Sequence, residues 1–285
     1  MNVRPYIHWI WLAPTGALLI PFFLIPILLL LRNSFYIDSP MGFLVPGFTL
    51  ENYAKVLSDP YYLRIFGNTF LSAIAVSIIA LLISYPFAWM LAQASGKGRV
   101  FLVWAVYLPI YASVIMRVFG WIVIIADSGI INEALMRIGL IAAPIRMINE
   151  VEGMTIGLLH RYLPLMILPL AAALSKVDGS LLRASSNLGG GWWFTWRRVI
   201  LPISIPGAVA GIQLVFASVL SDFVIPSMMG TPSFPMLAPS IFYEATTNAR
   251  WALSGAMGTL ILLSVALFLI CMNLIMRRFA PWAKL

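Results

Sequence analysis

Six stretches of 22 to 25 mostly apolar residues recur along this chain of 285 residues. A helix crosses the hydrocarbon core of a bilayer with about 20 apolar residues, so each stretch is long enough to span a membrane. A helix also satisfies its backbone hydrogen bonds internally, which a lipid environment demands. The sequence therefore predicts an all-α membrane protein in which residues 1–285 form a single transmembrane domain. The predicted spans are 9–31, 69–92, 101–125, 154–175, 204–226 and 254–276.

The composition supports this class and excludes several others. Hydrophobic residues make up 61% of the chain and charged residues only 10%, whereas about 25% of the residues of a soluble domain are charged. A soluble enzyme and a disordered tail are therefore excluded. A disulfide module is excluded as well, because Cys271 is the only cysteine. The first stretch begins too late, is too long and lacks a small-residue cleavage site, so we interpret it as a membrane anchor.

The basic residues indicate how the spans are oriented. With the N-terminus in the cytoplasm, ten Lys and Arg residues fall in inner segments and six in outer loops. Cytoplasmic loops carry an excess of Lys and Arg, so both termini are predicted to lie inside. The same placement accounts for the net charge of +8 without nucleic-acid binding. Tryptophans of the interfacial belt are expected at Trp9, Trp11, Trp251 and Trp282.

The residue patterns typical of enzymes are missing. The sequence has no GxxxxGK[ST] segment to hold ATP and no GxSxG segment to present a nucleophile. Its two histidines, His8 and His160, lack the spacing of metal ligands. Catalytic, cofactor-binding and metal-binding residues are therefore not predicted, and an intramembrane enzyme is disfavoured.

The loop 176–203, predicted to be cytoplasmic, carries the strongest local pattern. Asp178 is a good N-cap, and Gly189 is a good residue just past a helix C-terminus. Apolar and small residues recur between them at helical spacing, which predicts a helix of about ten residues. Such a helix is too short and too polar to span a membrane. It is either an ordinary interfacial helix or a docking surface for a soluble partner. The residues on its small-residue face are Leu181, Ala184, Ser185 and Leu188.

This loop resembles the EAA loop of ABC importer permeases, whose pattern runs E-A-A-x-x-L-G, a spacer and L-P. The matching residues are Ala184, Leu188, Gly189, Leu201 and Pro202. Arg183 replaces the acidic first residue of the pattern, and Ser185 replaces its third residue. Other segments are similar to the spermidine/putrescine branch of this family, in order along nearly the whole chain. They are 48–70, 108–125, 129–141, 162–178 and 221–230.

The resemblance implies a type I ABC importer permease fold in the bacterial inner membrane. The chain would be a pore subunit without catalysis, moving a polyamine or related nitrogenous solute inward. Its implied partners are a second, similar permease subunit, two cytoplasmic ATPases that bind ATP and Mg²⁺, an external binding protein and membrane lipid. The helix at about 179–189 would be the coupling helix. The residues implied at its ATPase contact are Arg183, Ala184, Ser185, Leu188 and Gly189.

The alternative is a self-sufficient secondary transporter or channel. The patterned inner loop disfavours it, as does the absence of an obvious repeat of broken helices, which is typical of many secondary transporters.

Three charges lie within the predicted spans. Each would cost roughly 2.5–3.5 kcal/mol at the bilayer centre, so each should face protein or water. Arg117 and Asp222 lie at similar depth in family-like segments, which predicts an ion pair between them. This pair would either lock two helices together or line the translocation path. Arg161 is expected to extend its side chain to the outer interface.

Two further pairs of residues remain open to two interpretations. Tyr107 and Trp121 either line the path or pack against other aromatic and apolar groups. Gly207 and Gly211 form a GxxxG motif, which is either a close contact between two helices or a chance occurrence in a span rich in small residues.

Overall fold

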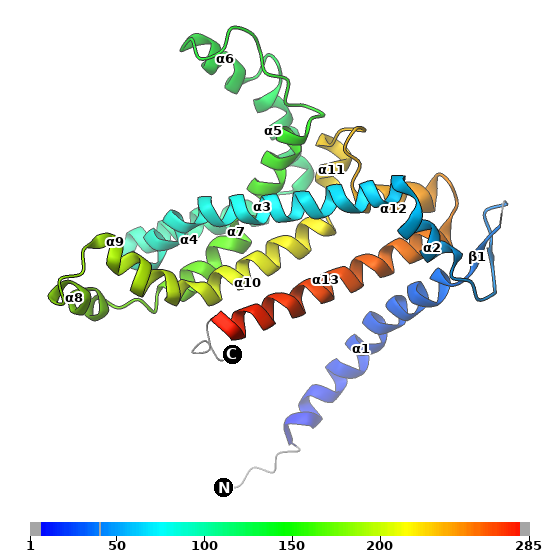
Figure 1. Ribbon diagram of the computed structural model, residues 1–285, viewed down its shortest axis with the longest axis horizontal. Coiled ribbons are helices and arrows are strands. Elements are labelled where there is room, and N and C mark those ends of the chain that lie inside the picture. The colour runs from blue at the N-terminus through cyan, green and yellow to red at the C-terminus, as the bar shows by residue number, and fades with distance from the viewer. Residues whose placement is uncertain (1–6, 40, 280–285) are drawn as a thin grey trace. The chain divides into compact units, whose positions relative to one another are not determined.

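The computed structural model describes residues 7–39 and 41–279, with side chains from residue 14 to residue 278 (Figure 1). Trp282 lies outside the described residues, as do the side chains of Trp9 and Trp11. The helices are α1 (Ile7–Ser34), α2 (Glu51–Ser58), α3 (Pro60–Gln93), α4 (Gly96–Tyr111), α5 (Val114–Ile125), α6 (Ile130–Arg137), α7 (Val151–Leu174), α8 (Gly179–Asn187), α9 (Trp192–Thr195), α10 (Leu201–Leu220), α11 (Val224–Met229), α12 (Leu237–Thr246) and α13 (Trp251–Phe279). A π-helical turn, η1 (Trp196–Ile200), joins α9 to α10, and β1 (Ile37–Asp38) pairs with β2 (Leu44–Val45).

Six helical segments among the described residues are long and apolar enough to cross a membrane. The prediction of a helical protein with six spans is thus confirmed, whereas the inside or outside position of the termini remains a prediction. The third and fifth of these segments, Val114–Arg137 and Trp192–Leu220, differ in their bounds from the predicted spans 101–125 and 204–226, and both predicted spans are interrupted. The stretch 101–125 divides into α4 and α5 at Ala112, whose backbone is extended, shortly after Pro109 in the last turn of α4. The stretch 204–226 divides into α10 and α11, and Asp222 lies in the break.

The chain folds into two compact units, and the first comprises residues 1–63 and 240–263. Residues 51–58 of this unit form the short helix α2. The carboxylate of Asp38 accepts hydrogen bonds from the backbone amides of Ala252 (2.8 Å) and Leu253 (3.0 Å). These amides have no partner within α13, because they belong to its first turn. The β1–β2 hairpin therefore supplies a cap for the start of α13.

The second unit comprises residues 64–239 and 264–285, and its core forms where α7 lies along α10 (Figure 1). Gly207 allows this close approach. A Cβ atom there would lie 2.5 Å from the carbonyl oxygen of Pro169 and 2.6 Å from Cβ of Ala173. At Gly211 it would lie 2.5 Å from Sδ of Met166. The GxxxG motif is therefore a close contact between two helices.

Gly207→Ala is expected to lower the free energy of unfolding by about 1–3 kcal/mol, because the added methyl group would meet a backbone carbonyl that cannot turn away. Thermal unfolding of the purified protein in detergent micelles measures the effect. Gly67→Ala is the matched control, since Gly67 also lies inside a helix, but beyond the backbone of that helix its added Cβ meets no described residue within 4 Å. Equal unfolding temperatures for the two variants would contradict the close contact.

Candidate functional site

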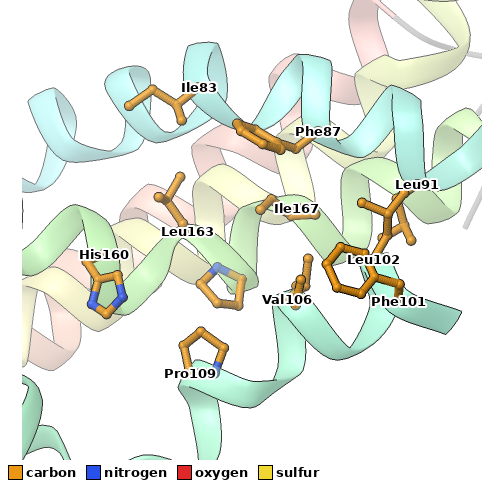
Figure 2. Close-up of a pocket in the computed structure, with 12 residues that line it drawn as sticks. Ile83, Phe87, Leu91, Phe101, Leu102, Val106, Pro109, His160, Leu163 and Ile167 are labelled. Carbon is orange, nitrogen blue, oxygen red and sulfur yellow. The ribbon is translucent and has the colours of Figure 1, made fainter. Parts of the chain in front are cut away.

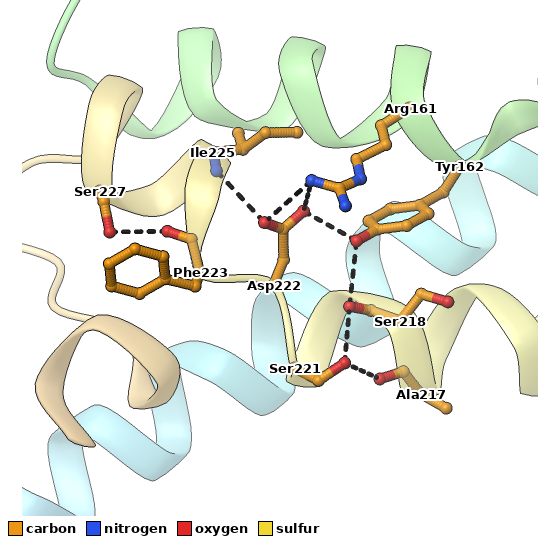
Figure 3. A network of polar contacts seen from close by, with 9 residues as sticks. All are labelled: Arg161, Tyr162, Ala217, Ser218, Ser221, Asp222, Phe223, Ile225 and Ser227. Atoms are coloured by element: carbon orange, nitrogen blue, oxygen red, sulfur yellow. Dashed lines mark hydrogen bonds and ion pairs between the residues drawn. The ribbon is translucent and has the colours of Figure 1, made fainter. Parts of the chain in front are cut away.

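Asp222 is the centre of a charged cluster in the second unit (Figure 3). Its carboxylate lies 3.3 Å from Nη1 of Arg161 on α7. It accepts a hydrogen bond from the Tyr162 hydroxyl (2.8 Å) and another from the backbone amide of Ile225 (3.2 Å). The Asp222 side chain has no exposed surface. Both carboxylate oxygens therefore have partners, and one of these bonds caps the first turn of α11.

The ion pair predicted between Arg117 and Asp222 is not the pair that the structure forms. Arg161, expected to reach the outer interface, contacts Asp222 instead. The reason is packing. The glycines of α10 bring α7 close, so that residues 161 and 162 of α7 reach the break at residue 222. The small residues of α10 indicated that some helix approaches closely, but the sequence carried no signal that this helix is α7 and not α5.

Arg117 lies on α5 beside this cluster. It lines a cavity of about 10 Å³ together with Trp121, His160 and Arg161. Its Nε atom is buried and has no hydrogen-bond partner among the described residues. The Trp121 ring meets the His160 ring edge to face, with 5.5 Å between the centroids. Tyr107, on α4, is absent from the lining of this cavity and is 38% exposed.

A larger groove lies between α3, α4 and α7 (Figure 2). Its volume is about 380 Å³, and its lining is apolar except for His160. His160 lies at one end of the groove in the view of Figure 2, with Leu91 and Phe101 at the other. The same histidine lines the cavity beside Arg117. The groove and the charged cluster therefore meet at His160.

The inner-loop helix α8 begins and ends as its sequence predicts. The Asp178 side chain accepts a hydrogen bond from the backbone amide of Ser180 at the first turn. Hydrogen bonds from the amide and hydroxyl of Ser180 lower the pKa of the Asp178 carboxyl group. The cap therefore holds at neutral pH and is lost as the pH falls through this lowered pKa. Gly189, with φ of +79°, ends the helix, and the Gly190 amide bonds to the Ser185 carbonyl.

The residues of α8 do not all face the same way. Arg183 and Ala184 are exposed, and Leu188, just past the end of the helix, is 87% exposed. Ser185 is buried, and its hydroxyl lies 2.7 Å from the hydroxyl of Thr195 on α9. The prediction that Ser185 shares the exposed face is wrong, because this hydrogen bond turns it toward α9. A large apolar side chain left in solvent makes Leu188 a candidate contact for another protein.

Sequence reasoning missed the aromatic link between this loop and the spans. Trp193 and Trp196 stack with 5.1 Å between ring centroids, and Trp196 meets Tyr85 of α3 at 6.0 Å. The Tyr85 hydroxyl lies 3.1 Å from that of Ser204 on α10. These contacts surround the π-helical turn η1, a geometry often found at functional sites. The three tryptophans close together in the sequence, Trp192, Trp193 and Trp196, could have indicated this aromatic link.

Relatives with established names match most of the chain. The spermidine/putrescine transport system permease protein PotB of Haemophilus influenzae is 34% identical over 252 residues, which are 88% of each chain. The chain belongs to this family of ABC importer permeases. The family member PotB of Escherichia coli is 29% identical and is covered over 91% of its length. The inner membrane ABC transporter permease protein YdcU of Escherichia coli is 31% identical and covered over 81%. No protein-family model matches the chain.

Solved structures confirm the fold expected for this family. A bacterial ABC transporter that imports the acidic polysaccharide alginate has a chain with a TM-score of 0.73, 19% identity and 96% coverage of both chains. A second structure, with a TM-score of 0.73 and 19% identity, is that of a bacterial alginate ABC transporter in complex with a periplasmic protein that holds an alginate pentasaccharide. This ABC importer permease is therefore a transport component of the inner membrane and not an enzyme.

Proposed function

We propose that this permease moves a small nitrogenous solute, a polyamine or a related amine, inward across the bacterial inner membrane. It pairs with a second, similar permease subunit. ATP and Mg²⁺ bind to two cytoplasmic ATPases, and an external binding protein delivers the solute. The names of the relatives support the solute class. The observation that carries the proposal is α8, a capped helix between two spans that leaves Leu188 87% exposed.

The coupling of ATP hydrolysis to transport is assigned to α8. Its exposed residues Arg183, Ala184 and Leu188, with Gly189 at its end, form the surface offered to an ATPase. The Trp193–Trp196 stack and η1 connect the loop to α3 and α10. ATP shifts such an assembly only if it binds one arrangement of the ATPases better than the other. Movement of the ATPases would then be transmitted through α8 to the spans.

Uptake into proteoliposomes tests the proposal. The permease, its partner permease, the ATPases and the binding protein are reconstituted together and offered labelled putrescine, spermidine and 4-aminobutyrate. We expect at least one solute to accumulate, and only when ATP and the binding protein are present. Uptake by the permease subunits alone, driven by an ion gradient, would instead support a secondary transporter. Uptake of none of the three would contradict the proposed solute class.

The orientation with both termini inside is tested by cysteine labelling in a variant without Cys271. We expect a membrane-impermeant maleimide to label Ser39→Cys and Thr247→Cys in intact cells, because the positive-inside rule places both loops outside. Ser95→Cys, between α3 and α4, should react only after the cells are opened. Labelling of Ser95→Cys in intact cells would overturn the predicted orientation.

A further inference from the structure

The charged cluster of the second unit carries more positive than negative charge. Arg117 and Arg161 line one cavity, and the carboxylate of Asp222 contacts Arg161. Arg161, Tyr162 and the amide of Ile225 already occupy the oxygens of this carboxylate. Arg117 forms no ion pair among the described residues, and its Nε atom is buried without a partner. One positive charge is thus left uncompensated, which is costly inside a membrane protein.

The surroundings of Arg117 define what could neutralise this charge. The cavity beside it is about 10 Å³, which is room for about one water molecule. Across His160 lies the apolar groove of about 380 Å³, within the size range of small-molecule sites. A ligand that fits both features has an anionic group at one end and an aliphatic chain at the other. Two arginines and one carboxylate leave a net positive charge here, which favours a carboxylate over an ammonium group at this end of the solute.

We propose that Arg117 binds a carboxylate of the transported solute, while the carbon chain of the solute lies in the groove beyond His160. This inference rests on the proposed function and narrows it, since the solute becomes an amine that also carries a carboxylate. Arg suits this role because its guanidinium group matches the two oxygens of a carboxylate. The cavity must widen to admit the carboxylate. Ala112, just before α5, has an extended backbone and separates α5 from α4.

The test uses two solutes of similar length in the complete reconstituted importer. 4-Aminobutyrate carries a carboxylate where putrescine carries its second aminomethyl group. We expect the wild-type importer to accumulate 4-aminobutyrate at least tenfold faster than putrescine. Arg117→Gln should reduce uptake of 4-aminobutyrate at least tenfold, and Arg117→Lys should retain part of it. Arg137→Gln is the control, because Arg137 is an exposed arginine that pairs with Glu133 of its own helix.

Each outcome decides a different point. Faster uptake of putrescine or spermidine than of 4-aminobutyrate would overturn the carboxylate site and leave the proposed function intact. Uptake of none of these solutes would overturn both. Unchanged uptake of 4-aminobutyrate by Arg117→Gln would show that another group binds the carboxylate and would also overturn the inference. If Arg117→Gln does not assemble, the ratio of 4-aminobutyrate uptake to putrescine uptake in the wild-type importer tests the carboxylate site by itself.

Discussion

Asp222→Ala is expected to destabilise the permease by up to about 3–5 kcal/mol, because it removes the fully buried carboxylate of an ion pair and leaves the partly exposed Arg161 without its counter-ion. The change takes the counter-ion from Arg161 and the hydrogen-bond acceptor from both the Tyr162 hydroxyl and the Ile225 amide. The cap of α11 is lost with it. Unfolding of the purified protein in detergent micelles, followed by tryptophan fluorescence, measures the shift.

Two comparisons separate the charge from the hydrogen bonds at this position. Asp222→Asn keeps one oxygen acceptor and should cost less than Asp222→Ala. Glu133→Ala breaks an exposed pair with Arg137 and should change stability by at most about 1 kcal/mol. A double-mutant cycle then identifies the partner of Asp222. Asp222→Asn should be non-additive with Arg161→Gln and additive with Arg117→Gln, and the reverse result would restore the pair predicted from the sequence.

The spans were predictable from hydropathy, but their interruptions were not. The segments 101–125 and 204–226 are apolar throughout most of their length, and an average over such a window does not record where a helix stops. Pro109 was a visible signal in the first segment, yet prolines also occur inside the continuous helices α3 and α7. Whether a proline ends a membrane helix depends on neighbours that re-satisfy the backbone, and these are known only from the tertiary structure.

The partners of individual side chains were the other feature that the sequence did not determine. The ends of α8 were predictable because Asp178 and Gly189 act within a few residues of themselves. The partner of Asp222 depends on which helix lies against the break after α10. The membrane depth that the sequence predicts for each residue favoured Arg117 over Arg161. Ser185 has helical spacing with Leu188 but bonds to Thr195, ten residues away. Signals within a few residues thus predicted where α8 begins and ends. Which of its residues are exposed depends on tertiary packing, which the sequence did not reveal.

Ala184→Trp is expected to reduce ATP-driven uptake at least tenfold while the permease still inserts and folds. Ala184 is exposed and lies four residues before Leu188, on the same side of α8. This side is the surface assigned to the ATPase contact. Overfilling a close-packed contact costs about 1–3 kcal/mol, and about 1.4 kcal/mol already corresponds to a tenfold change in affinity. Co-purification of the ATPase and the ATPase rate with and without binding protein show whether assembly or coupling is lost.

The matched control for this variant is Ser186→Trp on the same helix. Successive residues of an α-helix are about 100° apart, so Ser186 lies on nearly the opposite side from Ala184. Ser186 is exposed as well, and its hydroxyl donates a hydrogen bond to the Arg183 carbonyl of α8 itself. A tryptophan there adds the same bulk to the same loop on the side of Arg183, three residues away, and away from Ala184 and Leu188. The comparison therefore shows which side of the exposed surface meets the ATPase. Normal uptake by both variants would remove α8 from the coupling path, whereas equal loss in both would show that the loop tolerates no added bulk and would not locate the ATPase on one face.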